Sequence, residues 1–332
     1  MTTVPLEQAR VWAAAIFMAH GATPLAAQSV ARALVGAEAD GLKGHGLARI
    51  PTYVGMLKSG KIIGGAQPTL TRTKPSVLMV DAGCGFAYPA IDLACAELPA
   101  MARTGGIAFA GITRSSHAGA IGHHVERLAE QGLVALFFAN TPEAMAPWGG
   151  RQAVFGTNPI AFAAPLPGRE PLVIDMALSK VARANIIFAK QNGVTVPEGW
   201  ALDADGQPTT DPAAALKGTM VPMGEAKGAA LALMVEVLAA ALVGSHLSIE
   251  ASSFVDASGP PPGTGQSLIV IDPGSLGHGS FAPSMTRLAT AIEVQDGARL
   301  PGQRRLAARA RAMQRGIEIP AALVTQFGAP AK

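Results

Sequence analysis

The sequence predicts an α/β fold, with a sheet covered by helices on both faces and a small helical domain formed by the two termini. Three observations support this prediction. Short apolar segments alternate with segments of helical spacing from about residue 76 to residue 272. Helical spacing dominates both ends of the chain. Hydrophobic residues make up 49% of the 332 residues and charged residues only 15%, which provides enough apolar surface for a large core.

The first sixty residues are expected to form helices at residues 6–20, 24–39 and 47–57. Their apolar residues recur at the spacing of a helical face. Gly21 ends the first helix, and Thr23 and Pro24 begin the second as its N-cap and first helical residue. The third helix ends at Ser59-Gly60.

The middle of the chain alternates between the two kinds of element. We expect strands at residues 77–81, 107–112, 133–139, 159–164, 172–175 and 268–272. We expect helices at residues 87–103, 121–131, 179–191, 225–243 and 303–316. Residues 252–266 are rich in Pro and Gly and are expected to be a surface loop. The predicted division is a helical domain at 1–70, with C-terminal helices at 300–330 packing back on it, and an α/β domain at 71–299.

The charge gives no support for a nucleic-acid partner. The formal net charge is only +3. Arginines gather near the C-terminus, at Arg299, Arg304, Arg305, Arg309, Arg311 and Arg315. Because no aromatic residues are interleaved with them, they fit a small-anion or phosphate contact, or a solvated helix face, better than a nucleic-acid groove.

No targeting or membrane segment is expected. The first residues carry Glu7 and Arg10 and lack a basic start, so they do not form a signal peptide. The apolar run at residues 228–247 contains Glu236 and is interpreted as a buried core helix. Cys84 and Cys95 match no disulfide framework or metal motif and are expected to be small buried residues. We therefore expect a cytoplasmic protein without a membrane partner.

One glycine motif resembles the dinucleotide-binding fingerprint. Gly277-His278-Gly279, with Ala282 in the third position, follows the strand expected at 268–272. The glycines come several residues after the strand, Pro273 intervenes, and no acidic residue follows a second strand. We interpret the motif as an ordinary glycine loop, so any dinucleotide must bind outside the doubly wound pattern.

Two polar segments stand out from this apolar chain. In the first, His45 lies between glycines and Arg49 follows four residues later, at the start of a helix. A guanidinium can hold a carboxylate in a bidentate fork, and an imidazole can move the proton that accompanies hydride transfer to a 2-oxo or 2-imino acid. The spacing alone also fits a capping histidine and a surface arginine.

The second segment, residues 115–124, follows a strand and opens a helix, where free N–H groups can bind phosphate. It contains His117, His123 and His124, but no carboxylate completes a metal-ligand pattern. We therefore expect no metal site.

These segments resemble the malate/L-lactate dehydrogenase type 2 superfamily, most closely its Δ1-piperideine-2-carboxylate/Δ1-pyrroline-2-carboxylate reductases. The matching pieces are ADGLKGHGLARIPTYV, SSHAGAIGHHVERLAEQGLVAL, FGTNPIAFAAP, VIDMALSKVAR, GEAKGAALALMVEVL and LIVIDP, spread over about residues 5–315. Each piece is modest alone, and their order makes the match specific. The resemblance implies a non-Rossmann mixed-sheet cofactor-binding domain, which agrees with the missing fingerprint.

The resemblance also implies roles for individual residues. His45 and His117 match catalytic positions: His45 looks like the proton donor, and His117 is an acid/base in one branch. Substrate-binding positions are matched by Arg49, Thr157, Arg183 and Ala184. Cofactor-binding positions are matched by His117, Ala118, Gly119, Ala120, Ile121, Asp175, Met176, Ala177, Lys227, Arg304 and Arg305. The two terminal arginines favour NADP over NAD, although NAD remains an alternative, and the family implies a homodimer.

One departure from the family concerns the residue before His45. The family commonly has a relay serine there, whereas this chain has Gly44. A water molecule, another hydroxyl or His117 must then orient His45. The expected activity is NAD(P)H-dependent reduction of a cyclic imino acid to the L-amino acid, and the alternative is dehydrogenation of an open-chain 2-hydroxy acid of the malate, lactate or ureidoglycolate type. A catalytically silent binding protein would not need His45, Arg49 and His117 together.

Overall fold

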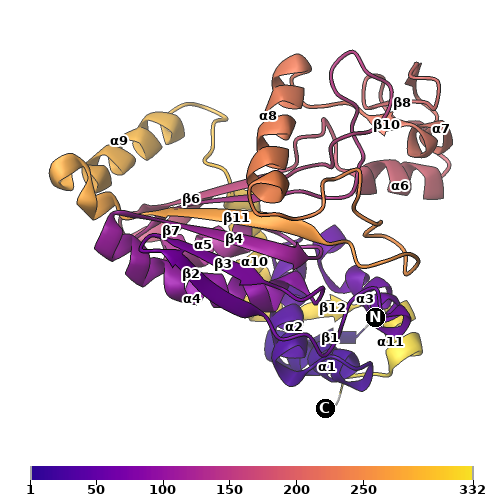
Figure 1. The fold of residues 1–332 in the computed structure, drawn as a ribbon, viewed down its shortest axis with the longest axis horizontal. Coiled ribbons are helices and arrows are strands. Elements are labelled where there is room, and N and C mark those ends of the chain that lie inside the picture. Colours follow the sequence, from indigo (N-terminus) through magenta and orange to yellow (C-terminus); the bar gives the residue numbers. More distant parts are fainter. Residues whose placement is uncertain (1, 331–332) are drawn as a thin grey trace.

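A mixed sheet forms the centre of the computed structural model, which describes residues 2–330 (Figure 1). Its strand order is β2-β3-β4-β11-β5-β6-β7. The strands are β2 (Thr69–Lys74), β3 (Val77–Asp81), β4 (Ile107–Ser115), β5 (Val134–Ala139), β6 (Ile160–Leu166), β7 (Arg169–Met176) and β11 (Thr264–Ile271). The predicted mixed α/β fold is confirmed.

The strand directions explain why no dinucleotide fingerprint is present. Only β3 and β4 are paired in parallel in this sheet, whereas β11 is antiparallel to both of its neighbours. A fingerprint needs a parallel strand–helix–strand unit, which β11 does not belong to. The Gly277–Gly279 segment is a short 3-10 turn before α9 (Phe281–Glu293), so its interpretation as a glycine loop is confirmed.

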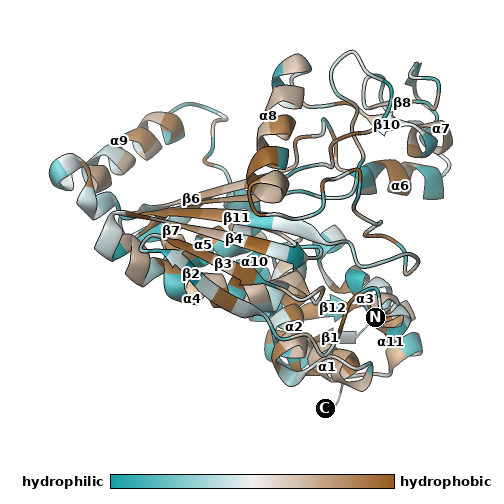
Figure 2. Ribbon diagram, in the orientation of Figure 1, coloured by the Kyte–Doolittle hydropathy of each residue, from teal (hydrophilic) through white to brown (hydrophobic). Residues whose placement is uncertain are grey.

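Both faces of the sheet are covered, as predicted. Helices α4 (Ala87–Gly105) and α5 (Gly122–Ala129) pack on one face, where residues such as Leu78, Ile91 and Phe137 are fully buried. Helix α8 (Ala226–Glu236) and a π-helical turn (Val237–Ala241) cover the other face. Figure 2 shows predominantly brown, hydrophobic strands between these layers.

The two chain ends form one helical unit. Strand β1 (Thr2–Val4) pairs with β12 (Ile317–Ile319), and their residues share one core with the first helices. The unit contains α1 (Leu6–Ala19), α2 (Pro24–Ala39), α3 (Ile50–Ser59), α10 (Gln303–Arg315) and α11 (Ala321–Phe327). The domain boundaries at 70 and 300 stay a prediction.

A third group of elements was not expected. Strands β8 (Ala201–Leu202), β9 (Pro208–Thr209) and β10 (Thr219–Met220) form a small sheet beside α6 (Arg183–Gln191) and α7 (Pro212–Lys217). Figure 1 shows this group beside α8, while α9 projects from the opposite end of the sheet. Strand β2 was also missed.

Four other expectations need correction. The helix expected from residue 179 begins at Arg183. The loop expected at 252–266 ends at residue 263, because Thr264 to Gln266 are buried in the central strand. The helix after residue 225 was expected to be a buried core helix, but it is buried on one side only. Of the two cysteines, Cys95 is buried, whereas Cys84 is only half-buried. No helix among residues 2–330 is long and apolar enough to cross a membrane.

An ion cluster joins the helical unit to the sheet. Arg309 on α10 donates from Nε and Nη2 to the two carboxylate oxygens of Asp40, at 2.7 Å each. Arg305 donates to both oxygens of Glu126 on α5, at 2.7 and 2.8 Å, and to Asp40 at 2.9 Å. The side chains of Asp40 and Glu126 are 0% and 4% exposed, so the pairs are largely removed from water. We call these four residues the ion cluster.

Replacing Arg309 by methionine should lower the free energy of unfolding by about 3 kcal/mol, because buried carboxylate charge loses a partner. Urea unfolding followed by circular dichroism measures this change. The control is Arg311→Met on the same helix, where the arginine is exposed, and its effect should be within about 0.5 kcal/mol. Equal stability of the two variants would contradict the role assigned to the ion cluster.

Candidate active site

A cavity of about 480 Å³ brings together most of the residues singled out in the sequence. It lies between the loop after α2, the ends of β4, β5 and β7, the start of α6 and residues 251–255. The predicted residues that line it are His45, Arg49, His117, Ala118, Gly119, Ile121, Thr157, Asp175, Ala177, Arg183 and Ala184. Side chains distant in the sequence thus share one cavity.

The loop that carries His45 is held by a buried carboxylate. Glu38 accepts a hydrogen bond from the Leu47 backbone N–H at 2.9 Å and pairs with Lys43. A Cβ at Gly46 would lie 2.2 Å from a Glu38 oxygen, so only glycine fits there. At Gly44 a Cβ would be 3.9 Å from the Ala184 Cβ, so the family's serine could be accommodated.

Arg49 is fixed to the backbone without an acidic partner among the described residues. Its Nε donates to the Gly44 carbonyl at 2.8 Å, and Nη1 lies 3.4 Å from the Phe254 carbonyl. These contacts leave donors of the guanidinium for a ligand in the cavity. Arg183, also without an ion-pair partner in residues 2–330, lines the same cavity.

The two histidines are stacked, with ring centroids 5.4 Å apart and planes at 9°. Burial, followed by the charge of Arg49, lowers the pKa of His45 to about 4. Burial, followed by the charges of Arg49 and His45, holds the pKa of His117 well below its usual 6.5. Both imidazoles are therefore neutral at pH 7.

The segment from Ser115 to Ile121 forms a tight wall. The Gly119 backbone has φ +70°, and a Cβ there would lie 2.6 Å from the Tyr88 hydroxyl. The Gly122 N–H, which was expected to be free for phosphate, donates to the Asp175 carboxylate at 2.8 Å. The expected anion site at this helix start is therefore partly occupied by Asp175, whose pKa burial raises.

Sequence reasoning missed a buried network behind the cavity. Glu236 accepts hydrogen bonds from Asn158 at 2.8 Å and from the Ser248 N–H and hydroxyl at 2.6 and 2.7 Å. Asn140, which lines the cavity, donates to the His246 carbonyl at 2.9 Å. A carboxylate inside the apolar run at 228–247 was the available signal, because such a group must have partners when buried.

Five predicted cofactor residues do not line this cavity: Ala120, Met176, Lys227, Arg304 and Arg305. Ala120 and Met176 adjoin lining residues. Lys227 lies in another depression with Trp148 and Lys180, and Arg304 is exposed. Arg305 is engaged in the ion cluster, so its guanidinium is already paired with carboxylates. The cofactor roles of these residues stay predictions.

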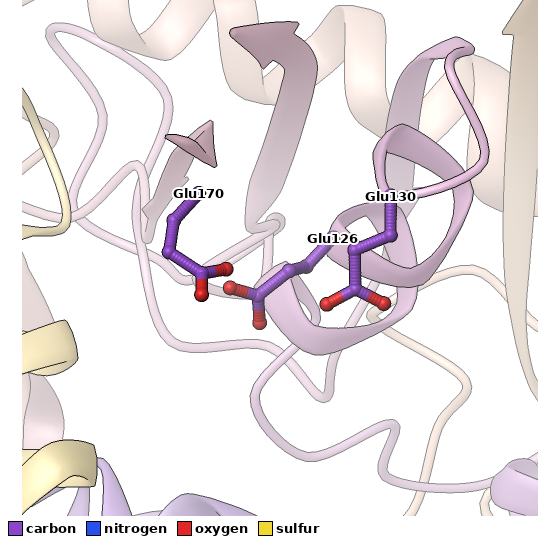
Figure 3. Close-up of side chains that lie close together, drawn as sticks. All are labelled: Glu126, Glu130 and Glu170. Atoms are coloured by element: carbon purple, nitrogen blue, oxygen red, sulfur yellow. The ribbon is translucent and has the colours of Figure 1, made fainter. Parts of the chain in front are cut away.

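Figure 3 shows Glu126, Glu130 and Glu170 with their carboxylates turned toward one another, and their ligand atoms lie within 4.8 Å. Glu126 already accepts hydrogen bonds from two guanidinium groups of the ion cluster. Burial and the two neighbouring carboxylates raise the pKa of Glu130. We assign no metal to this group.

The pKa of His45 can be measured directly by an NMR titration of its ring. The wild-type inflection is expected near pH 4. In Arg49→Met the pKa should rise, because a nearby positive charge is removed, yet stay below 6.5 because the burial remains. A wild-type inflection near the ordinary value of 6.5, or no change in the variant, would contradict this account.

The comparisons with known proteins agree over the whole chain. The family model described as Malate/L-lactate dehydrogenase matches residues 4–327. The (2R)-3-sulfolactate dehydrogenase (NADP(+)) of Chromohalobacter salexigens is 47% identical, over 98% of this chain and 97% of that protein. The Delta(1)-pyrroline-2-carboxylate/Delta(1)-piperideine-2-carboxylate reductase of Pseudomonas putida is 42% identical, over 95% and 93%.

A solved structure is similar throughout. The delta1-piperideine-2-carboxylate reductase from Pseudomonas syringae pvar. tomato has a TM-score of 0.93 and 40% identity, with all of both chains covered. The fold, the family model and these relatives give one result. The chain belongs to the malate/L-lactate dehydrogenase family and is an oxidoreductase.

Proposed function

We propose that this protein is an NADP(H)-dependent oxidoreductase that moves a hydride to or from C2 of a small 2-substituted carboxylate. The observation that carries the proposal is the cavity in which two neutral, stacked histidines lie beside a guanidinium that has no acidic partner among the described residues. Such a site can bind the carboxylate of a substrate and exchange a proton with the oxygen or nitrogen on its C2. The relative that is named with NADP(+) supports the choice of cofactor.

The cavity suits the nicotinamide end of the cofactor. Ala118 and Gly119 line this part of the cavity without bulky side chains. Asp175 lines the cavity with a carboxylate that can accept hydrogen bonds from amide or hydroxyl groups. We propose that His117 to Ile121 and Asp175 to Ala177 hold this end. Bound NADPH supplies the hydride.

The chain's own groups then perform two tasks. Arg49 fixes the substrate carboxylate, which places C2 beside the histidines and shortens the reaction path. His45 exchanges the proton with the oxygen or nitrogen on C2. Its low pKa suits the oxidising direction, in which a neutral imidazole must accept a proton.

The guanidinium of Arg183 is the reason why we prefer one substrate class over the other. Arg183 lines the cavity with Arg49, at the start of α6, where the helix dipole also favours an anion. Neither arginine forms an ion pair within residues 2–330, while the carboxylates of Glu143 and Asp175 line the same cavity. Two cations that are free to contact a ligand fit a substrate with two anionic groups. We therefore propose a 2-hydroxy acid with a second anion, of the 3-sulfolactate class, and the 47% identical relative supports it.

Reduction of a cyclic imino acid is the second candidate. It is the activity that the sequence favoured, and the relatives named as pyrroline- or piperideine-2-carboxylate reductases support it. Gly44 is compatible with this candidate, because an imine that is already protonated needs no hydroxyl relay. This substrate would leave Arg183 without an anionic partner.

We further propose a homodimer. Leu233, Met234, Val237 and Leu242 on and after α8 are large apolar side chains that are 41–59% exposed. A contiguous apolar surface of this kind is typical of an interface between subunits.

Replacing Arg183 by methionine tests the substrate class. With NADP+ and (2R)-3-sulfolactate the variant should lose about 100-fold in kcat/KM, since a charge-assisted contact is removed. With NADPH and Δ1-piperideine-2-carboxylate it should change less than about threefold. Steady-state NADPH absorbance measures both. Wild-type turnover of the imine alone would reject the dianionic substrate.

Replacing Arg49 by lysine should raise KM at least about tenfold, because lysine keeps the charge but loses the planar fork. The kcat at saturating substrate should change less than KM, since the residue binds the carboxylate in the ground and transition states alike. An unchanged KM would show that the carboxylate binds elsewhere.

A further inference from the structure

The chain contains only two tyrosines. Tyr53 is hydrogen-bonded to His117, and Tyr88 is hydrogen-bonded to Tyr53. The Tyr53 hydroxyl lies 2.6 Å from His117 Nδ1 and 2.9 Å from the Tyr88 hydroxyl. Each tyrosine is 1% exposed. They come from α3 and α4, which are separate helices, so the fold places two buried hydroxyls in line behind one active-site ring.

We propose that Tyr53 and Tyr88 lock His117 as the neutral tautomer with its proton on Nε2. His117 then donates a hydrogen bond into the cavity, and proton exchange is left to His45. The part of this inference that assigns catalytic roles rests on the proposed function, whereas the tautomer itself does not.

The number of hydroxyl protons determines the direction of the hydrogen bonds between Tyr88, Tyr53 and His117. Tyr88 has one hydroxyl hydrogen, and its hydroxyl has no hydrogen-bond partner other than Tyr53 in the described part of the chain. If Tyr88 donates to Tyr53, then Tyr53 donates to Nδ1 of His117, and every proton has an acceptor. In the reverse direction the Tyr88 proton would be buried without a partner, which costs about 1–3 kcal/mol. The first arrangement requires a bare Nδ1.

Tyr53 and Tyr88 do not carry protons away from His117. Burial raises the pKa of both tyrosines, that of Tyr88 well above its usual value, so neither becomes a phenolate near neutral pH. His117 therefore cannot take a proton from Tyr53, because that step would leave a phenolate. The hydroxyls set the tautomer and orientation of the ring, which makes them positioning residues.

His45 has no such lock. Its Nδ1 is buried without a partner, and neither ring nitrogen is hydrogen-bonded within residues 2–330. Its protonation is therefore free to change with the substrate. The stacked pair divides the work, with a fixed donor at His117 and a proton acceptor at His45.

Nitrogen-15 NMR of the histidine rings tests the tautomer without any substrate. Three other histidines provide references in the same spectrum. Nδ1 of His20 and of His246 faces a carbonyl and must carry a proton, whereas Nε2 of His124 faces the Ala118 carbonyl. At about pH 8, His117, identified with His117→Gln, should share the pattern of His124. A proton on Nδ1, as in His20, would overturn the inference.

The matched variants Tyr88→Phe and Tyr53→Phe remove one buried hydroxyl each. Tyr88→Phe keeps the Tyr53–His117 contact, but either Tyr53 or His117 can then donate the hydrogen bond. The His117 signals should become those of mixed tautomers, and kcat should fall about two- to tenfold with KM unchanged. Tyr53→Phe should mix the tautomers at least as much. Unaltered His117 signals in both variants would show that the tyrosines only fill space.

The division of roles is tested with glutamine, which can donate a hydrogen bond but cannot accept a proton. His117→Gln should retain more activity than His45→Gln and keep the wild-type pH dependence of kcat/KM. Loss of that pH dependence in His117→Gln would assign the proton acceptor to His117 and overturn the division. Correct tautomers with no turnover of any tested acid would instead contradict the proposed function alone.

Discussion

The ion cluster of Asp40, Glu126, Arg305 and Arg309 is the interaction on which the site depends. Asp40 comes five residues before His45, and Glu126 comes nine residues after His117. Pairing their carboxylates with α10 therefore fixes the two histidine loops relative to one another. Burial alone would raise the pKa of Asp40, but hydrogen bonds from His123, Arg309 and Arg305 more than offset it and hold the pKa well below its usual range. Deprotonated Asp40 thus persists over all ordinary pH values.

In the proposed mechanism, Arg49 couples substrate binding to proton exchange. Its positive charge disfavours a charged His45, and the same charge would bind the substrate carboxylate. A bound carboxylate would neutralise part of that charge, so the pKa of His45 would rise when substrate is present. The imidazole would then become a better base only after the substrate has bound. Glycine at position 44 leaves this control to Arg49 and the histidine pair, without a serine hydroxyl.

The sequence predicted elements well where they bury an apolar face and carry a capping residue. Thr23 and Pro24 mark the start of α2 correctly, since the Thr23 hydroxyl accepts from the Ala26 N–H. Strand β2 was missed because an edge strand with Arg72 and Lys74 shows no apolar alternation. In the site, His45, Arg49 and His117 were found as polar residues in an apolar chain. Tyr53 was not, because its hydrogen bonds join residues 35 and 64 positions away in the sequence.

The proposed function requires direct transfer of hydrogen between C2 of the substrate and the cofactor in the cavity of His45, Arg49 and His117. The most direct measurement uses 3-sulfolactate deuterated at C2 with NADP+, followed by mass spectrometry of the nicotinamide product. We predict that the label appears on the cofactor and that His45→Gln slows its transfer by about 100-fold or more. Label released to water, or transfer that is unaffected by His45→Gln, would contradict it.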